Sequence, residues 1–67
     1  MKPSTPQKIE RALDVRAWRL VRIHGSHHIW KSGDGTLTVV VPFHRGNLAP
    51  GTQRTIMRVA GLTDDDV

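Results

Sequence analysis

The sequence has no cysteine, few aromatic residues and no long apolar run. Without cysteine there is no disulfide framework and no cysteine-based zinc site, a composition that fits a reducing cytoplasm. No apolar stretch approaches the roughly 20 residues that cross a bilayer, and the first residues lack the apolar segment of a signal peptide. We therefore expect a cytoplasmic protein without a membrane segment. The three aromatic residues, Trp18, Trp30 and Phe43, are few for a protein that binds single strands by base stacking.

Acidic side chains are also scarce. The sequence has ten Lys and Arg against six Asp and Glu, and three of the six acids form the terminal run Asp64, Asp65 and Asp66. Residues 1–63 therefore carry ten basic side chains against three acidic ones, a balance that attracts polyanions such as nucleic acids. The plain alternative is a solvated basic surface that only keeps the protein in solution.

The length, 67 residues, allows one domain with one core. We expect that domain over residues 1–67, with its core in residues 6–62 and an acidic tail in residues 63–67. A core of this size is small, so a partner that covers one face would add to its stability.

Helix signals lie near both ends of the chain. The hydroxyl residues and proline of Ser4-Thr5-Pro6 predict a helix over residues 6–16. Pro50 starts a second helix, which Gly61 ends as a C-cap. The face of this helix predicted to pack inward holds Thr52, Ile56, Val59 and Ala60. Thr63, followed by three aspartates, resembles the start of a third helix that the chain cuts short.

Three strands are predicted between the helices, over residues 18–24, 27–31 and 36–41. Gly25-Ser26 suits a two-residue hairpin turn, and Asp34-Gly35 supplies a second turn. Pro42 closes the third strand. The order helix, three antiparallel strands, helix is α+β, because neither helix crosses over between two strands. Packing both helices on one face of the three-stranded sheet buries both apolar stripes and leaves the other face open. This α-β-β-β-α layout is of the double-stranded-RNA-binding-domain type.

The chain has four histidines, the residue type whose imidazole ordinarily exchanges a proton near neutral pH: His24, His27, His28 and His44. An imidazole can remove a proton from a ribose 2′-OH or donate one to a leaving oxygen, and RNA carries its own nucleophile. Other chemistry has few residues to use. Outside the acidic tail, Glu10 and Asp14 lie on an exposed helix face and Asp34 lies in a turn, so a paired-carboxylate site is hard to build. The residues therefore favour RNA cleavage over other hydrolytic chemistry.

The cluster His24-x-x-His27-His28 has the composition of a zinc site, but its geometry argues against one. Successive strand residues point to opposite faces, so His27 and His28 cannot both reach one ion without a bulge. The same alternation limits a catalytic role to one of the two. His27 shares a face with Lys31, and His28 shares one with Trp30. The sequence leaves open which face is exposed, and a structural role for either histidine remains an alternative.

Three segments resemble HicA toxins. Residues 25–31, Gly-Ser-His-His-Ile-Trp-Lys, resemble the Gly-Ser-His-His-aromatic stretch of that family. Residues 40–44, Val-Val-Pro-Phe-His, resemble its Val-Pro-x-His segment. Residues 51–62 resemble its closing helix, Gly-Thr-(Leu)-Arg-x-Ile-(Leu)-x-x-Ala-Gly-Leu. The match runs from about residue 9 to residue 62 with the spacings in register.

The resemblance implies the toxin of a type II toxin–antitoxin system, a metal-independent endoribonuclease that cleaves mRNA without the ribosome and needs no cofactor. It also implies the double-stranded-RNA-binding-like fold. The family's catalytic histidine maps to His27 and a variable position maps to His28, which we treat with His44 as a possible auxiliary residue. The partner implied is a HicB antitoxin that covers the active site, with operator DNA bound only through HicB. A non-catalytic RNA-binding module and a subunit that acts only inside a complex are the alternatives.

Four basic residues are predicted to bind RNA: Lys31, Arg45, Arg54 and Arg58. The alternative for each is an ordinary solvated charge. Two positions depart from the family's pattern. Ala17 replaces a glycine often found before the first strand, which predicts a different end to the first helix. His24 stands where the family often has lysine or glutamine, which weakens the cationic surface above pH ~6.5.

Overall fold

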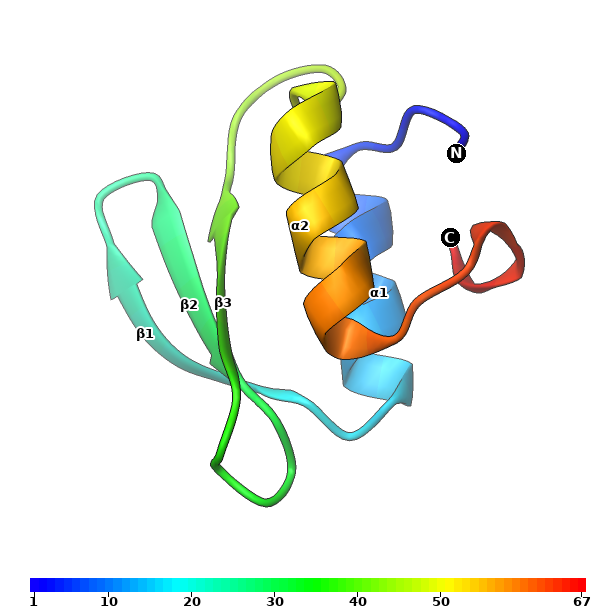
Figure 1. The fold of residues 1–67 in the computed structure, drawn as a ribbon. Helices are drawn as coiled ribbons and strands as arrows, with labels where there is room; N and C mark the ends of the chain where they lie inside the picture. The colour runs from blue at the N-terminus through cyan, green and yellow to red at the C-terminus, as the bar shows by residue number, and fades with distance from the viewer.

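The computed structural model describes residues 1–67 and contains a three-stranded antiparallel sheet and two helices (Figure 1). The elements, in chain order, are α1 (Pro6–Val15), β1 (Arg19–His24), β2 (His27–Lys31), β3 (Thr38–Pro42), α2 (Pro50–Ala60) and a short 3₁₀ helix, η1 (Asp64–Asp66). The strands follow one another across the sheet in the order β1-β2-β3. The predicted α+β class and element order are confirmed. The third strand begins two residues later than predicted and includes Pro42, whose backbone pairs with His27.

Helix α1 begins at a side-chain cap and ends in a left-handed residue. The Thr5 hydroxyl accepts a hydrogen bond from the Lys8 amide at 3.3 Å. At the other end Ala17 has a φ of 65°, and the Trp18 amide donates to the Leu13 carbonyl at 3.0 Å. This is a Schellman motif, which normally has glycine in the left-handed position. At the position for which the sequence predicted a different helix end, alanine therefore adopts the left-handed conformation that this motif requires.

Helix α2 ends in the same motif, with Gly61 at a φ of 68° and the Leu62 amide donating to the Met57 carbonyl at 2.8 Å. Its buried face differs from the prediction. The residues buried on α2 are Gln53, Ile56 and Met57, whereas Val59 and Ala60 lie at the edge of the core and Thr52 is half-buried. The inward face is therefore turned toward Gln53 and Met57.

Gln53 is fully buried because both ends of its amide have partners. Its Oε1 accepts a hydrogen bond from the Ser4 amide at 2.9 Å, and its Nε2 donates to the Lys2 carbonyl at 2.6 Å. A buried polar group costs little when it is hydrogen-bonded. Ser4, one of the predicted helix-start residues, therefore ties the N-terminal segment to α2.

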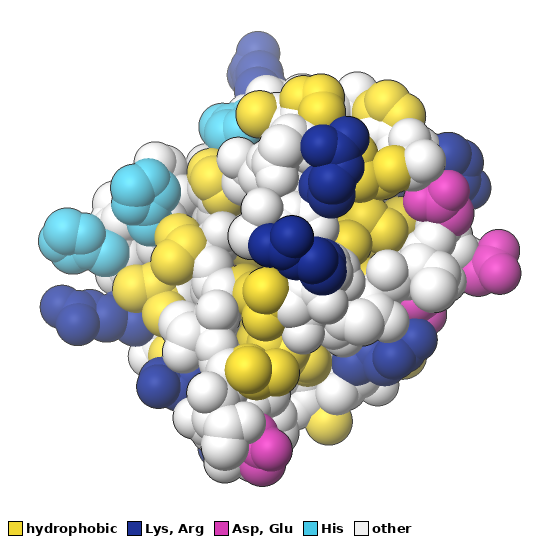
Figure 2. Space-filling model, in the orientation of Figure 1, with side chains coloured by type: hydrophobic (Ala, Val, Ile, Leu, Met, Phe, Trp, Pro, Cys, Tyr) yellow, Lys and Arg dark blue, Asp and Glu magenta, His cyan; other side chains and the backbone are white.

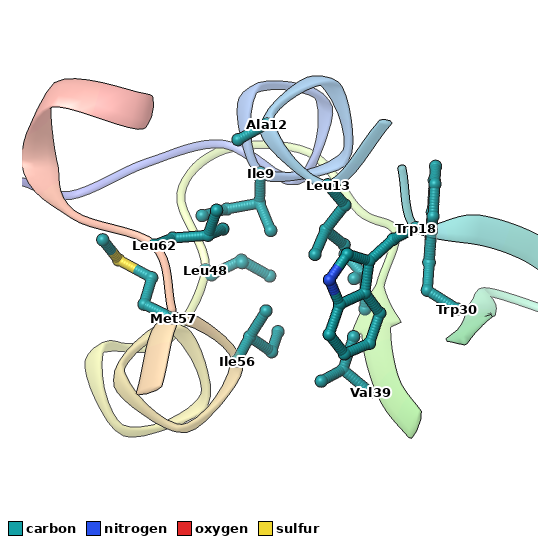
Figure 3. Packing of buried hydrophobic residues seen from close by; sticks show 11 residues of the cluster. Ile9, Ala12, Leu13, Trp18, Trp30, Val39, Leu48, Ile56, Met57 and Leu62 are labelled. Atoms are coloured by element: carbon teal, nitrogen blue, oxygen red, sulfur yellow. The ribbon is translucent and has the colours of Figure 1, made fainter. Parts of the chain in front are cut away.

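One hydrophobic core joins the two helices to the sheet. Figure 3 shows Trp18 and Trp30 at the sheet side of the core and Leu48 between the helices. Both helices pack against β3, whereas every residue of β1 is exposed. In Figure 1 the helices lie together on one side and the β1–β2 hairpin lies farthest from them. One face of the sheet is therefore left open, as predicted.

The acidic tail folds back on the helices. Thr63 caps η1 by accepting and donating hydrogen bonds with Asp66, and the Asp66 carboxylate forms an ion pair with Arg16 at 3.0 Å. The hydrogen bond from the Thr63 amide, followed by those from the Arg16 and Thr63 side chains, lowers the pKa of Asp66. The predicted start of a third helix is thus present as a 3₁₀ turn. No helix of the structure has the length and apolarity that a membrane crossing requires.

Candidate active site on the open face of the sheet

The strand pairing defines which side chains share the open face. Residues that pair across antiparallel strands point to the same side of the sheet. The open face therefore carries these side chains, by strand: Arg19, Arg22 and His24; His27, Ile29 and Lys31; Thr38, Val40 and Pro42.

His27 lies on this face because β2 alternates without a break. The pairing of β2 with β3 is continuous from His27 to Lys31, so these two residues point to the same side. Both side chains are exposed, whereas Trp30, one residue before Lys31, is buried in the core. The predicted shared face of His27 and Lys31 is confirmed. The face left open by the helices is the one that carries His27.

A bulge in β1 adds residues that the sequence pattern missed. The register shifts between Leu20 and Arg22, which leaves Val21 without a partner on β2. Because of this extra residue, Arg19 points to the same side as Arg22 and His24 instead of to the opposite side. His24 pairs directly with His27 across the hairpin turn. The two-residue turn predicted at Gly25-Ser26 was the signal that could have placed His24 opposite His27.

The open face has cations and no carboxylate. Its charged residues are Arg19, Arg22 and Lys31, together with the two histidines. The acidic residues lie elsewhere; Figure 2 shows them on the side of the helices and at the bottom, whereas the histidines lie on the left and the Lys and Arg side chains are spread over the whole visible surface. Asp34, in the turn before β3, accepts hydrogen bonds from the Ser32 hydroxyl and from the Thr36 amide and hydroxyl. These bonds, with Ser32 contributing most, lower its pKa to about 2.

His28 points to the opposite side, toward α1. Its Nδ1 lies 2.8 Å from Oε2 of Glu10, and Nε1 of Trp30 donates to the same oxygen at 2.6 Å. The His28 ring also stacks on Phe43, with centroids 4.4 Å apart and an interplanar angle of 9°. The side chains of His28 and Glu10 are each only 15% exposed. The predicted pairing of His28 with Trp30 on one face is confirmed, and the structure does not bring His28 together with His27.

His44 and Arg45 lie in the loop after β3, at the same end of the sheet as His27. The loop is held to the β1–β2 turn by the Phe43 amide, which donates to the Ser26 carbonyl at 2.6 Å. The His44 Nδ1–H donates to the Arg45 carbonyl at 2.9 Å, so one ring nitrogen is occupied. Both residues are exposed, and they follow Pro42, which pairs with His27.

Arg54 and Arg58 lie in the helical layer. Both are exposed on α2, beside Met1 and Asp64, on the side of the sheet opposite His27. The structure therefore brings only Lys31, of the four basic residues predicted to bind RNA, onto the face of His27. The largest hollow, about 410 Å³ between α2 and β3, includes none of the four histidines in its lining.

Metal-ligating side chains do not converge. No group of three or more His, Asp or Glu side chains is close enough to hold one ion. Within the predicted cluster, His24 and His27 share the open face and His28 lies on the other.

The comparison with protein families gives one match. A family model described as the HicA toxin of bacterial toxin–antitoxin systems matches residues 6–62, which include both helices and all three strands. A search of the curated proteins gives no match. The family match rests on nearly the whole folded chain and leaves out only the N-terminal segment and the acidic tail.

Proposed function

Because the chain belongs to the HicA toxin family of bacterial toxin–antitoxin systems, we propose that it is an endoribonuclease that cleaves mRNA, with His27 as a general acid or base. The observation that carries this proposal is the position of His27. It is exposed at the end of the central strand β2, on a cationic sheet face that has no carboxylate. A phosphodiester can approach this face without repulsion from an acidic side chain.

The reaction follows from RNA's own chemistry. The ribose 2′-oxygen attacks the adjacent phosphorus and loses its proton to a base, while the bond from phosphorus to the 5′-oxygen breaks and that oxygen takes a proton from an acid. The products are a 2′,3′-cyclic phosphate and a 5′-hydroxyl. An imidazole performs either proton transfer, and the neighbouring cations stabilise charge on the phosphate. We propose that no metal ion or other cofactor takes part.

RNA binding is assigned first to the cations of the same face. Lys31 has the strongest case among the predicted residues because it shares a face with His27, and Arg19 and Arg22 join it. Arg45 lies in the loop after β3, at the same end of the sheet as His27. Arg54 and Arg58 are in the other layer, so they would contact only RNA that extends around the molecule. This placement makes them suitable controls for the open-face cations.

The membership in a toxin–antitoxin family implies an antitoxin partner. We propose a HicB-type antitoxin that covers the open face and presents Asp and Glu to its cations, since occlusion and charge complementarity both act there. Any binding to operator DNA would occur through that partner.

The test is cleavage of a purified mRNA transcript by the wild-type chain and by His27→Ala, with EDTA present. We expect cleavage by the wild-type chain, products that end in a 2′,3′-cyclic phosphate, and cleavage at least about 10²-fold slower by the variant. Restoration of lost activity by one divalent ion would overturn the metal-free mechanism. Binding of RNA by the wild-type chain without any cleavage would instead support a non-catalytic RNA-binding module.

A further inference from the structure

The four histidines fall into two classes by their contacts. His28 is held by Glu10, and His44 is held by the Arg45 carbonyl. The rings of His24 and His27 make no hydrogen bond or ion pair within the chain, and both are exposed. The two free rings are also the two that pair directly across β1 and β2. Free imidazoles that face each other at a strand end are available for proton transfer.

We infer that His24 is a second catalytic residue, which forms an acid–base pair with His27. This inference rests on the proposed ribonuclease function and deepens it. It gives His24 a role that a lysine or glutamine at that position would not have, because only imidazole exchanges a proton near neutral pH.

The hairpin geometry brings the two rings to one phosphate. His24 and His27 flank the two-residue turn Gly25-Ser26, where Gly25 takes a φ of 61°. Directly opposed residues on antiparallel strands have Cβ atoms roughly 4.5–5.5 Å apart. The attacking 2′-oxygen and the leaving 5′-oxygen lie on opposite sides of the same phosphorus atom. Two rings from neighbouring strands can therefore flank the phosphate, whereas one ring would have to move between the two oxygens.

The proton balance of the pair is complete. One ring begins neutral and takes the 2′-OH proton, while the other begins protonated and gives its proton to the 5′-oxygen. The two rings end in exchanged protonation states, and exchange with solvent restores them. No oxidant, metal ion or further reactant is required.

The charged groups around the pair are few. On β1 the next residue facing the same side is Arg22, and on β2 the charged residue of this face is Lys31. The residues of β3 on this face carry no charge, and no helix covers it. The loop after β3 brings His44 and Arg45 to the same end of the sheet. No carboxylate lies beside either ring, and neither histidine forms an ion pair.

The test is the pH dependence of kcat/KM for RNA cleavage by the wild-type chain and by His24→Ala. We expect a bell-shaped profile for the wild-type chain, because the reaction needs one neutral and one protonated imidazole. His24→Ala should reduce kcat/KM roughly 10²-fold or more and remove one limb of the bell. Its affinity for an uncleavable 2′-O-methyl RNA and its melting temperature should stay close to those of the wild-type chain.

A substrate with sulfur in place of the 5′-bridging oxygen separates the two roles, since a thiolate leaves without a proton. This substrate should restore cleavage to one of the two alanine variants, the one that has lost the acid, and not to the other. Arg19→Gln is the matched control: this cation lies at the far end of the same face, and its loss should weaken binding but keep both limbs of the bell.

If the wild-type chain cleaves RNA, and His24→Ala cleaves it at the same rate with both limbs of the pH profile kept, the acid–base pair is overturned. The proposed ribonuclease function is then unaffected. Rescue of neither variant by the sulfur substrate would also overturn the pair. Absence of any cleavage by the wild-type chain would overturn the proposed function itself, so the two failures are distinct.

Discussion

His27 and His28 are neighbours in the sequence and lie on opposite faces of the sheet, in opposite environments. His27 is exposed on a face with three cations, and no side chain of the protein holds its ring. His28 is held by Glu10 and stacked on Phe43. The same residue type therefore occupies two environments in one short strand: the ring of His28 is fixed by its contacts, whereas the ring of His27 is free, as the proposed proton transfer requires.

The covered face uses a polar cluster where a hydrophobic one would be expected. Glu10 of α1 accepts hydrogen bonds from His28 and Trp30 of β2 through one carboxylate oxygen. This links α1 to β2, in addition to the packing of both helices against β3. By fixing the strand residue next to His27, the cluster also holds the backbone that carries the proposed catalytic ring.

The largest effect is expected from removing the exposed histidine, His27, and it falls on cleavage activity. His27→Ala should lower kcat/KM for RNA about 10²- to 10⁴-fold, the usual contribution of a general acid or base. The free energy of unfolding should stay within about 0.5 kcal/mol of the wild-type value, because the side chain is exposed and makes no hydrogen bond within the chain. Parallel cleavage assays and urea unfolding would measure both quantities. An alanine variant that cleaves at the wild-type rate would remove His27 from the mechanism.

The matching change on the covered face is Glu10→Ala, which should act on stability. It leaves the His28 and Trp30 ring nitrogens without their acceptor, and a donor left unsatisfied in a partly buried site costs about 1–3 kcal/mol. Urea unfolding would show this as a lower midpoint with little change in slope. Glu10→Gln keeps an acceptor oxygen and should lose less. Equal stability of all three chains would show that the cluster contributes nothing to the fold.

RNA binding should depend more on the cations of the open face than on those of the helical layer, and this effect is smaller than the two above. Lys31→Gln combined with Arg22→Gln should reduce the salt dependence of RNA binding by roughly one unit of slope for each phosphate that is no longer neutralised. The control pair Arg54→Gln with Arg58→Gln removes the same charge from α2 and should change the slope less. Filter binding across a range of salt concentrations would measure both. Equal slopes for the two double variants would mean that RNA does not favour the open face.

The arrangement of elements was predictable because local signals agreed with the fold. The Gly25-Ser26 turn and the β-branched run before Pro42 specify strands that need no distant information. The alternation of β2 also separated His27 from His28 correctly. Which face was open depended on where the helices pack, and the strand pattern alone does not contain that information.

Other features could not be predicted from the sequence, because they depend on contacts between residues that are far apart in the chain. Gln53 is buried only because Ser4 and Lys2, at the other end of the chain, satisfy its amide. The sequence pattern places Glu10 on an exposed helix face, whereas in the structure His28 and Trp30 of β2 supply two hydrogen-bond donors to its carboxylate. The bulge at Val21, which brings Arg19 onto the open face, has no glycine or proline to mark it. Side-chain partners and strand register decided these cases, and neither can be read from periodicity.

The smallest effect is expected on stability, from a change at Ala17 in the connection between α1 and β1, which belongs to neither face of the sheet. Ala17 is exposed and left-handed, a conformation that costs a residue with a Cβ about 1–2 kcal/mol. Ala17→Gly removes that cost but adds about 0.4–1 kcal/mol of backbone freedom to the unfolded chain. We therefore expect a net stabilisation of roughly 0.5–1 kcal/mol and unchanged cleavage. Gly61→Ala, at the equivalent position of α2, is the mirror control and should destabilise by a similar amount. Thermal melts would give the change in stability of each variant. A destabilised Ala17→Gly variant would show that the left-handed conformation of Ala17 is not strained.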